Sequence, residues 1–177
     1  MLTKTNFFIA VLIVVSIILK SGAAYCESKN EAGLYYKNII PGKTSAEQAF
    51  KIVGKTEKTR KNDDNTVSYI YNTKKEGFPN EITVKGDQII HMAIAIEDTA
   101  ELNIEQVVET LGEAKRKGFS FYAFTLRVAA YPEKGMVFIY EEKDGSVVEK
   151  QFFTPQTADE FEKSFGKNFP KEYPYKM

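Results

Sequence analysis

Two stretches of the chain carry the same pattern of apolar and polar residues. Residues 45–54 align with residues 103–112 at a constant offset of 58 positions. In both stretches apolar side chains recur at the three- and four-residue spacing of one helix face, and a glycine follows the last of them. The pattern therefore predicts two short helices that begin and end at equivalent positions of an internal repeat.

Sequence signals for a helix start precede both stretches. In a capping box, the side chain at the N-cap and the one three residues later satisfy free backbone amides of the first turn. The matching pairs are Ser45 with Gln48 or Thr44 with Glu47 in the first copy, and Asn103 with Gln106 in the second. A third box, Thr157 with Glu160, predicts another short helix that ends at Gly166.

Alternating apolar and polar residues follow each of the first two helices, as is typical of half-buried β-strands. The predicted strands are 66–71, 81–85 and 88–96 in the first copy, and 122–131, 136–142 and 146–154 in the second. The predicted fold class is therefore α+β, with two tandem modules. Each module is expected to be a short helical segment followed by a three-stranded antiparallel meander.

The predicted domain boundaries divide the chain into four parts. These are a signal peptide at 1–24, a first module at 34–98, a second module at 99–155, and a C-terminal short helix with an extended tail at 156–177. The connection between the modules is short and lacks the Gly/Ser-rich composition of a flexible linker. We therefore expect the modules to share a continuous sheet or a tight interface.

The first residues have the features of an export signal. Lys4 gives a positive start, residues 7–19 form an uncharged apolar run, and small residues follow that run. The run is shorter than the roughly 20 residues that a membrane-spanning helix needs. Cleavage is predicted between Ala24 and Tyr25, with a cut after Cys26 as the alternative. The protein is thus expected to be exported, to the periplasm or the extracellular space.

Cys26 is the single cysteine of the chain, so no disulfide can form within one molecule. Its position after the apolar run raises the question of lipid attachment, but a bacterial lipoprotein signal has a small residue where this chain has Tyr25. Membrane contact is therefore expected only through a partner or through a lipid at Cys26, and Tyr25 argues against the lipid.

Charge excludes one class of partner. The formal net charge of the whole chain is +0, and loss of the two lysines in residues 1–24 leaves the mature part slightly acidic. A nucleic-acid-binding domain usually carries a clear basic excess. No nucleic-acid partner is expected.

A search for catalytic and cofactor motifs gives none that we retain. Gly42-Lys43-Thr44 lacks the upstream glycine of a phosphate-binding loop, and residues 62–65 lack the alternating ligands of a calcium loop. His91, the single histidine, is predicted on the strand face opposite the isoleucines, as a solvent-facing or satisfied side chain. No carboxylate has a sequence context that suggests a shifted pKa. We predict no catalytic, cofactor-binding or metal-binding residues.

Basic residues recur at equivalent places after the two helices. They are Lys55, Lys58, Arg60 and Lys61 in the first copy, and Lys115, Arg116 and Lys117 in the second. Equivalent positions suggest that both clusters lie on one edge of the molecule, where they would meet an anionic partner. Solvated loops are the alternative interpretation.

The run 41–45, the helix ending at Val53-Gly54-Lys55 and the strands after it resemble the SmpA/OmlA (BamE-like) envelope domain. The tandem arrangement is similar to that of the β-lactamase-inhibitor protein. This resemblance implies helix-plus-sheet modules that bind other proteins, and it transfers no functional residues.

These observations favour a non-enzymatic protein-binding or adaptor protein of the bacterial cell envelope. The outward sheet face is expected to contact an envelope or secreted protein through aromatic and polar side chains. The alternatives are a secreted enzyme inhibitor that inserts a loop into an active site, and a periplasmic carrier of a small molecule or lipid.

Overall fold

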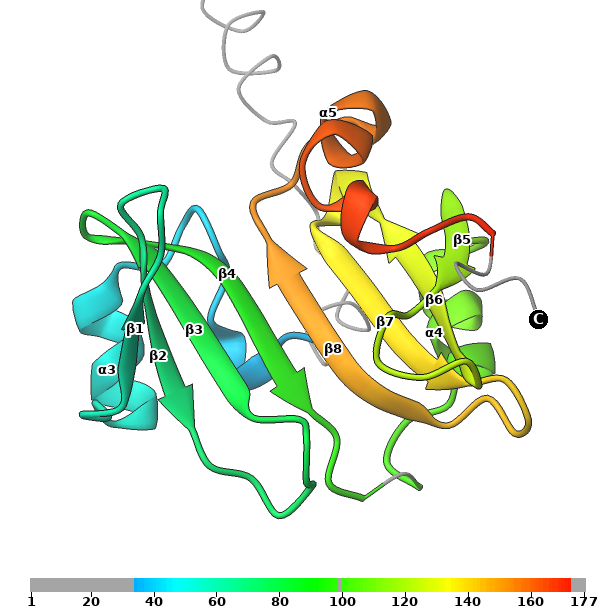
Figure 1. The fold of residues 1–177 in the computed structure, drawn as a ribbon, viewed down its shortest axis with the longest axis horizontal. Helices are drawn as coiled ribbons and strands as arrows, with labels where there is room; N and C mark the ends of the chain where they lie inside the picture. The colour runs from blue at the N-terminus through cyan, green and yellow to red at the C-terminus, as the bar shows by residue number, and fades with distance from the viewer. Residues whose placement is uncertain (1–33, 99, 173–177) are drawn as a thin grey trace, which may run out of the picture.

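One continuous antiparallel sheet organises the molecule (Figure 1). The computed structural model describes residues 34–98 and 100–172. Its eight strands follow the order β1-β2-β3-β4-β8-β7-β6-β5, so the two copies of the repeat meet where β4 pairs with β8. The expected fold class is therefore wrong: the structure is a single eight-stranded sheet domain and not two tandem helix-plus-three-strand modules.

Each half of the sheet follows a helix. The first half contains α3 (Ala46–Val53), β1 (Thr59–Lys61), β2 (Val67–Tyr71), β3 (Asn80–Lys85) and β4 (Gln88–Ala95). The second half contains α4 (Ile104–Leu111), β5 (Arg116–Phe119), β6 (Leu126–Tyr131), β7 (Met136–Glu141) and β8 (Val147–Phe153). Shorter helical segments are η1 (Tyr36–Asn38), η2 (Pro132–Lys134), α5 (Ala158–Lys163) and η3 (Gly166–Asn168).

The strands that the sequence did not predict are β1 and β5. Both consist largely of charged residues in the lysine-rich connections, which lack the apolar alternation of a half-buried strand. They form the two ends of the sheet, where charged side chains are common because they discourage pairing with other chains. Each half of the sheet therefore has four strands instead of three.

The predicted helix starts are confirmed. Capping boxes close the first turns of α3, α4 and α5 through the pairs Ser45/Gln48, Asn103/Gln106 and Thr157/Glu160. The ends of α3 and α4 also fall at the predicted glycines. α5 ends earlier than predicted, with Ser164 as its C-cap, and Gly166 begins η3.

Equivalent contacts join each helix to its half of the sheet. Ala46 N donates to Asp87 O and Ile104 N donates to Gly145 O, both at 2.9 Å and both at the offset of 58 residues. The tyrosine that ends β2 or β6 donates its hydroxyl to the glycine after the helix: Tyr71 to Gly54 O and Tyr131 to Gly112 O. Equivalent hydrogen bonds therefore join helix and sheet in both halves of the molecule.

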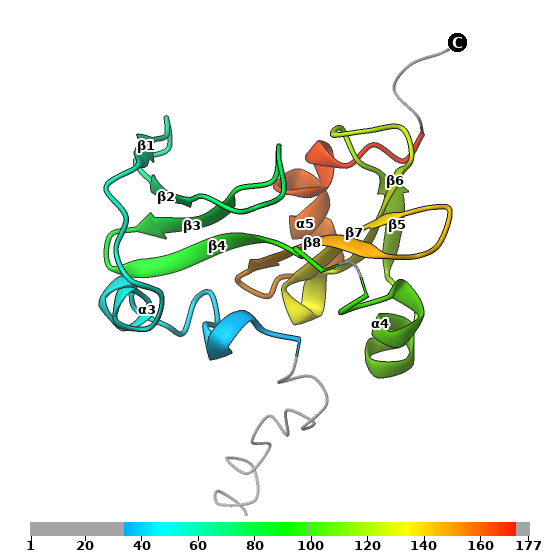
Figure 2. The same ribbon diagram turned by 90° about the horizontal axis from the view of Figure 1, so that it is seen from below.

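Two apolar cores lie on opposite faces of the sheet. Helices α3 and α4 cover one face, and α5 covers the β6–β8 part of the other (Figure 2). The sheet curves so that both ends rise on the side of α5, which makes that face concave (Figure 2). The concave face over β1–β4 has no helix on it and holds the candidate site.

A β-bulge changes one predicted side-chain orientation. The register of β3 against β4 shifts between Thr83 and Val84, so Ile89 enters the core and is fully buried. Ile90 lies instead beside His91, on the concave face. The alternation from Met92 onward agrees with the prediction, with Met92 and Ile94 in the core on the helix side.

The predicted signal peptide, its cleavage position and Cys26 lie outside the residues that the structure describes. Within 34–98 and 100–172, no helix has the length and apolar character that crossing a membrane would require.

Candidate functional site

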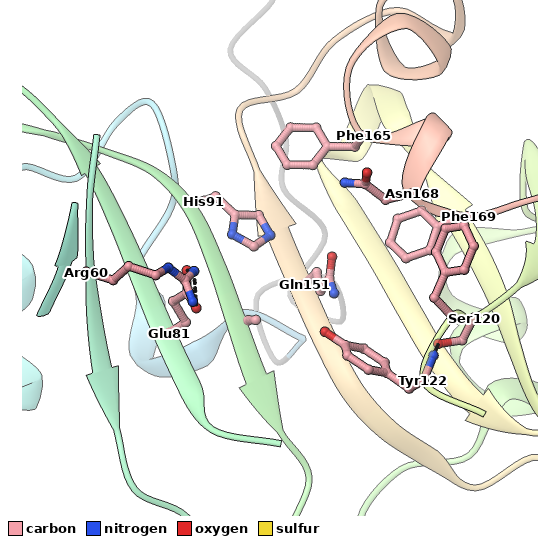
Figure 3. Close-up of a pocket in the computed structure, with 11 residues that line it drawn as sticks. Arg60, Glu81, His91, Ser120, Tyr122, Gln151, Phe165, Asn168 and Phe169 are labelled. Atoms are coloured by element: carbon pink, nitrogen blue, oxygen red, sulfur yellow. Dashed lines mark hydrogen bonds and ion pairs between the residues drawn. The ribbon is translucent and has the colours of Figure 1, made fainter. Parts of the chain in front are cut away.

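A cleft of about 330 Å³ lies on the concave face, between the β3–β4 part of the sheet and the C-terminal segment (Figure 3). Elements from both halves of the sheet contribute to its walls. The lining residues are Arg60, Glu81, His91, Ala93, Ser120, Phe121, Tyr122, Gln151, Phe165, Asn168 and Phe169. The cleft therefore combines polar groups from the strands with aromatic rings from two peripheral segments.

An ion pair forms one wall. Arg60 on β1 donates from Nη2 to both carboxylate oxygens of Glu81 on β3, at 2.8 and 3.1 Å. Asn62 accepts from Arg60 Nε at 3.2 Å and donates in turn to Thr66 and Ser68. This network holds the guanidinium in a fixed orientation above the sheet, where a bound group would meet both a cation and an anion.

His91 stands at the centre of the cleft and stacks on Phe165, with ring centroids 5.3 Å apart. Its position opposite the core-facing side chains of β4 agrees with the prediction, and it is partly buried. Desolvation lowers the pKa of the imidazole, while Glu81 and Gln151 act in the opposite direction. The neutral imidazole can donate one hydrogen bond and accept another.

Glu149 on β8 is a buried carboxylic acid next to this cleft. Its side chain points to the concave face, only 2% of the residue is exposed, and it accepts a hydrogen bond of 2.5 Å from Gln151 Nε2. Burial raises the pKa of Glu149 to about 7, and Glu81 adds to the rise. No sequence context around Glu149 had suggested this shift of its pKa.

Sequence analysis missed Glu149 because its burial depends on distant segments. One weak signal was present. In β8 three polar residues, 149–151, stand between the apolar pairs 147–148 and 152–153. Because side chains of a strand alternate between its faces, some of these polar side chains share a face with buried apolar ones. Which strand would lie on each side of β8 could not be derived from that pattern.

Two loops from opposite halves meet at one end of the cleft. Phe78, before β3, contacts Tyr122, before β6, with ring centroids 5.2 Å apart. Lys75 lies over the Phe78 ring at 5.4 Å, and burial lowers the pKa of this lysine. Glu149 acts electrostatically on both Lys75 and Tyr122, so these side chains lie near it.

Exposed aromatic side chains lie on the loop between β5 and β6. Phe121 is 59% exposed, Tyr122 58% and Phe124 67%, which are the largest exposed fractions among the bulky apolar residues of the described chain. Phe121 and Tyr122 also line the cleft. The loop therefore places solvent-exposed rings on the rim of a polar cleft, a combination typical of protein-binding surfaces. We refer to residues 121–124 as the aromatic loop.

The two predicted basic clusters do not share an edge. Arg60 and Lys61 lie on β1, with Lys55 and Lys58 just before it, whereas Arg116 and Lys117 lie on β5 at the opposite end of the sheet, with Lys115 just before it. The expectation of one basic edge is corrected by the strand order. Of these residues, the structure brings only Arg60 into the cleft.

Arg116 is also unavailable to a partner. It is 9% exposed, and its guanidinium donates to Glu162 Oε1 at 2.8 Å and to the carbonyl oxygens of Gly166 and Phe169. It therefore fastens the C-terminal segment to β5. Lys117 pairs with Glu113 at 2.9 Å on the surface.

Within the part of the chain that the structure describes, no three His, Cys, Asp or Glu side chains gather as metal ligands. The Asp-rich turn at 62–65 has a structural arrangement: Asp64 accepts from the Thr66 hydroxyl at 2.6 Å, which lowers the pKa of Asp64.

Comparison with known proteins gives little further information. No family model matches the chain, and no curated protein matches it. Its fold was compared with solved structures, and a match was found to the 1.5 Å crystal structure of an extracellular protein containing an SCP domain from Bacillus anthracis str. Ames. The TM-score is 0.45 at 12% identity, over 72% of this chain and 53% of that one, so this chain spans about half the length of that protein.

Proposed function

We propose that this chain is an exported, non-enzymatic protein-binding or adaptor protein of the bacterial cell envelope. The observation that carries the proposal is the cleft on the concave face, where the Arg60–Glu81 pair and His91 lie beside the exposed aromatic loop. Aromatic rings contribute most of the binding energy at many protein interfaces, and a fixed ion pair adds orientation. Residues 1–24 support export, and the resemblance to the SmpA/OmlA domain stays a prediction.

Binding is favoured over catalysis by the contacts within the cleft. The Ser120 hydroxyl accepts a hydrogen bond from the Tyr122 amide at 3.1 Å, and among the described residues no hydrogen bond links it to His91. A nucleophile and its base are expected within hydrogen-bond reach of one another. The aromatic loop is also the feature that favours the second candidate, a secreted inhibitor that inserts a loop into an enzyme.

In-cell cross-linking of the tagged protein, followed by affinity purification and mass spectrometry, tests the proposal. The variant F121S/F124S removes two exposed rings from the aromatic loop and should lose a stoichiometric protein partner. Ile52→Ser is the matched control, because Ile52 is also a large apolar residue, 49% exposed, but lies on α3 away from the cleft.

Retention of the partner by wild type and I52S, with loss in F121S/F124S, would support the proposal. An envelope assembly protein as the partner would favour the adaptor, and an enzyme that loses activity would favour the inhibitor. A retained small molecule without any protein partner would overturn both and favour the carrier.

A further inference from the structure

A second cavity, of about 470 Å³, lies on the helix-covered face between α4 and the sheet. Val108 on α4, Ala129 on β6 and Tyr140 on β7 supply its apolar walls. Three glutamates of the α4 segment, Glu105, Glu109 and Glu113, also line it, together with one cation, Lys117, and we call this cavity the α4 groove. It lies on the opposite face of the sheet from the cleft.

The first half of the molecule fills the equivalent place with its own side chains. There Phe50 on α3 packs against Tyr69 on β2, with ring centroids 4.5 Å apart. The offset of 58 residues makes Val108 the counterpart of Phe50. Ala129 is the counterpart of Tyr69. Tyr69 stands two residues before Tyr71 and Ala129 two residues before Tyr131, and these two tyrosines form equivalent hydrogen bonds to the glycines after the helices.

The second half has thus lost two aromatic rings from the space between helix and sheet. It has gained one ring, because Tyr140 in β7 occupies the position that Val84 occupies in β3. Val84 pairs with Val67 four residues before Tyr71, and Tyr140 pairs with Arg127 four residues before Tyr131. This ring lines the α4 groove and leaves it open. Ala129 on the sheet lines the groove, which therefore reaches from the helix surface down to the sheet.

Charge differs between the two helices in the same region. In the first half, the residues equivalent to the three glutamates are Glu47, Lys51 and Lys55, and Lys51 forms an ion pair with Glu47 at 2.7 Å. In α4 all three are glutamates, spaced four residues apart, which places like charges next to one another.

The glutamates towards the C-terminus of α4 are unfavourable for the helix itself. Glu113 lies just beyond the C-terminus of α4, where the helix dipole favours a cation. Glu113 pairs with Lys117, whereas no ion pair is found for Glu105 or Glu109 within the described chain. The two remaining carboxylates leave a negative rim beside an apolar groove.

We propose that the α4 groove binds an aromatic side chain of a partner protein that has a lysine or arginine next to it in sequence. The ring would occupy the space left by the missing Phe50–Tyr69 pair, against Val108, Ala129 and Tyr140. The neighbouring cation would pair with Glu105 and Glu109. The α4 groove is separate from the cleft, and a second site on the opposite face would let one molecule hold two partners.

Titration of the ¹⁵N-labelled mature protein with short capped peptides tests this site by NMR. The probe is acetyl-Gly-Trp-Arg-Gly-amide, with acetyl-Gly-Trp-Glu-Gly-amide and acetyl-Gly-Ala-Arg-Gly-amide as comparators. Saturable shifts of amides in α4 and near Ala129 are expected with the first peptide, with at least about fivefold weaker binding of each comparator. No saturable shift at α4, or equal binding of all three peptides, would overturn the proposal.

Two variants separate the contributions of shape and charge. V108F/A129Y restores the aromatic pair of the first half and should abolish binding of the Trp-Arg peptide. E105Q/E109Q changes only exposed carboxylates and should weaken that binding about two- to tenfold at low salt. The matched control is E47Q, at the position of α3 equivalent to Glu105, and it should bind as wild type. Wild-type affinity in E105Q/E109Q would contradict the proposed cation contact.

F121S/F124S distinguishes this inference from the proposed function. That variant alters the cleft rim and should leave peptide binding at the α4 groove unchanged. Loss of the cellular partner in F121S/F124S with intact peptide binding would support both sites, whereas absent peptide binding with a retained cleft partner would overturn the groove alone.

Discussion

Phe78 and Tyr122 meet edge to face, with ring centroids 5.2 Å apart, although they belong to opposite halves of the sheet. Their contact links the loop before β3 to the aromatic loop. Because β4 and β8 are already paired beneath them, this contact is a second connection between the halves, on the concave side. The two rings therefore connect the two halves of the sheet at one end of the cleft.

Truncation of these rings should show that they act together. Phe78→Ala and Tyr122→Ala should each destabilise the protein, and a double-mutant cycle in urea should give a coupling energy of about 0.5–1.5 kcal/mol. Phe124→Ala is the control, because Phe124 lies in the same loop but is mostly exposed, and it should change stability by less than about 0.5 kcal/mol. Additive effects of the first two substitutions would contradict the coupling.

The buried Glu149 should make stability decrease as the pH rises. Its pKa in the folded state is about 7, whereas an unfolded glutamate titrates near its ordinary value of about 4.3. Between these values the folded state binds more protons than the unfolded state, so stability is full below about pH 4 and is lost as the pH rises through 7. The shift corresponds to about 4 kcal/mol.

Comparison of wild type with Glu149→Gln isolates this contribution. The glutamine should gain stability relative to wild type as the pH increases from 4 to 8, measured by urea unfolding at several pH values. A constant stability difference across this range would show that the pKa of Glu149 is the same in the folded and unfolded states. His91 must be considered separately, because its lowered pKa has the opposite effect: it favours the folded state above about pH 6.5 and destabilises it on acidification.

His91 can be observed directly, since it is the single histidine of the chain and gives one set of imidazole resonances. Its pKa should lie below the ordinary value of about 6.5. Glu81→Gln should lower this pKa further, because the negative charge of Glu81 favours the protonated ring. NMR titration measures both values, and a higher pKa in the variant would exclude the electrostatic contact with Glu81.

Arg116 should contribute to stability and not to partner binding. Arg116→Met removes the ion pair with Glu162 and leaves the carbonyl oxygens of Gly166 and Phe169 without their guanidinium donor, at a cost of about 2–3 kcal/mol. Lys115→Ala is the control from the same basic cluster, because Lys115 is not fully buried and should change stability by less than about 0.5 kcal/mol. Equal unfolding midpoints of the two variants would contradict the structural role of Arg116.

Gly135, which begins the turn into β7, should not tolerate a side chain. Its φ of +66° is in the left-handed region, and a Cβ there would overlap the Phe153 carbonyl oxygen and lie 3.1 Å from Pro155 N. Gly86 has a similar φ of +60°, but a Cβ at Gly86 would have no atom within 4 Å, so Gly86→Ala should cost only the backbone strain of about 1 kcal/mol. Gly135→Ala should cost at least about 2 kcal/mol more, measured by urea unfolding. Similar costs for both alanines would mean that the backbone around Gly135 relaxes freely.

Local features of the fold could be predicted because they depend on residues close in sequence. The capping pairs, the glycines after α3 and α4, and the apolar alternation of the longer strands each involve a few neighbouring residues. The repeat at an offset of 58 also indicated the equivalence of the two halves, which the paired Tyr71 and Tyr131 contacts repeat in three dimensions. These local signals identified three of the four strands in each half.

The site could not be predicted in the same way. His91 was placed on the correct face of its strand, but the groups around it come from β1, β3, β8, the aromatic loop and the C-terminal segment. Arg60 was chosen as a member of a basic cluster, yet its cleft position depends on its pairing with Glu81 across β2. Such positions follow from strand order, which the apolar pattern of one strand does not specify.

The sequence by itself determined where the helices begin, where the glycines end α3 and α4, and that the pattern occurs twice. Only the tertiary structure decided that β4 pairs with β8, that charged segments form the outer strands, and that Glu149 is buried. The physical reason is the range of the interactions. Helix caps and apolar alternation depend on residues close together in sequence. Strand order and burial depend on contacts between segments far apart in the chain, and the local sequence does not specify which of those segments come together.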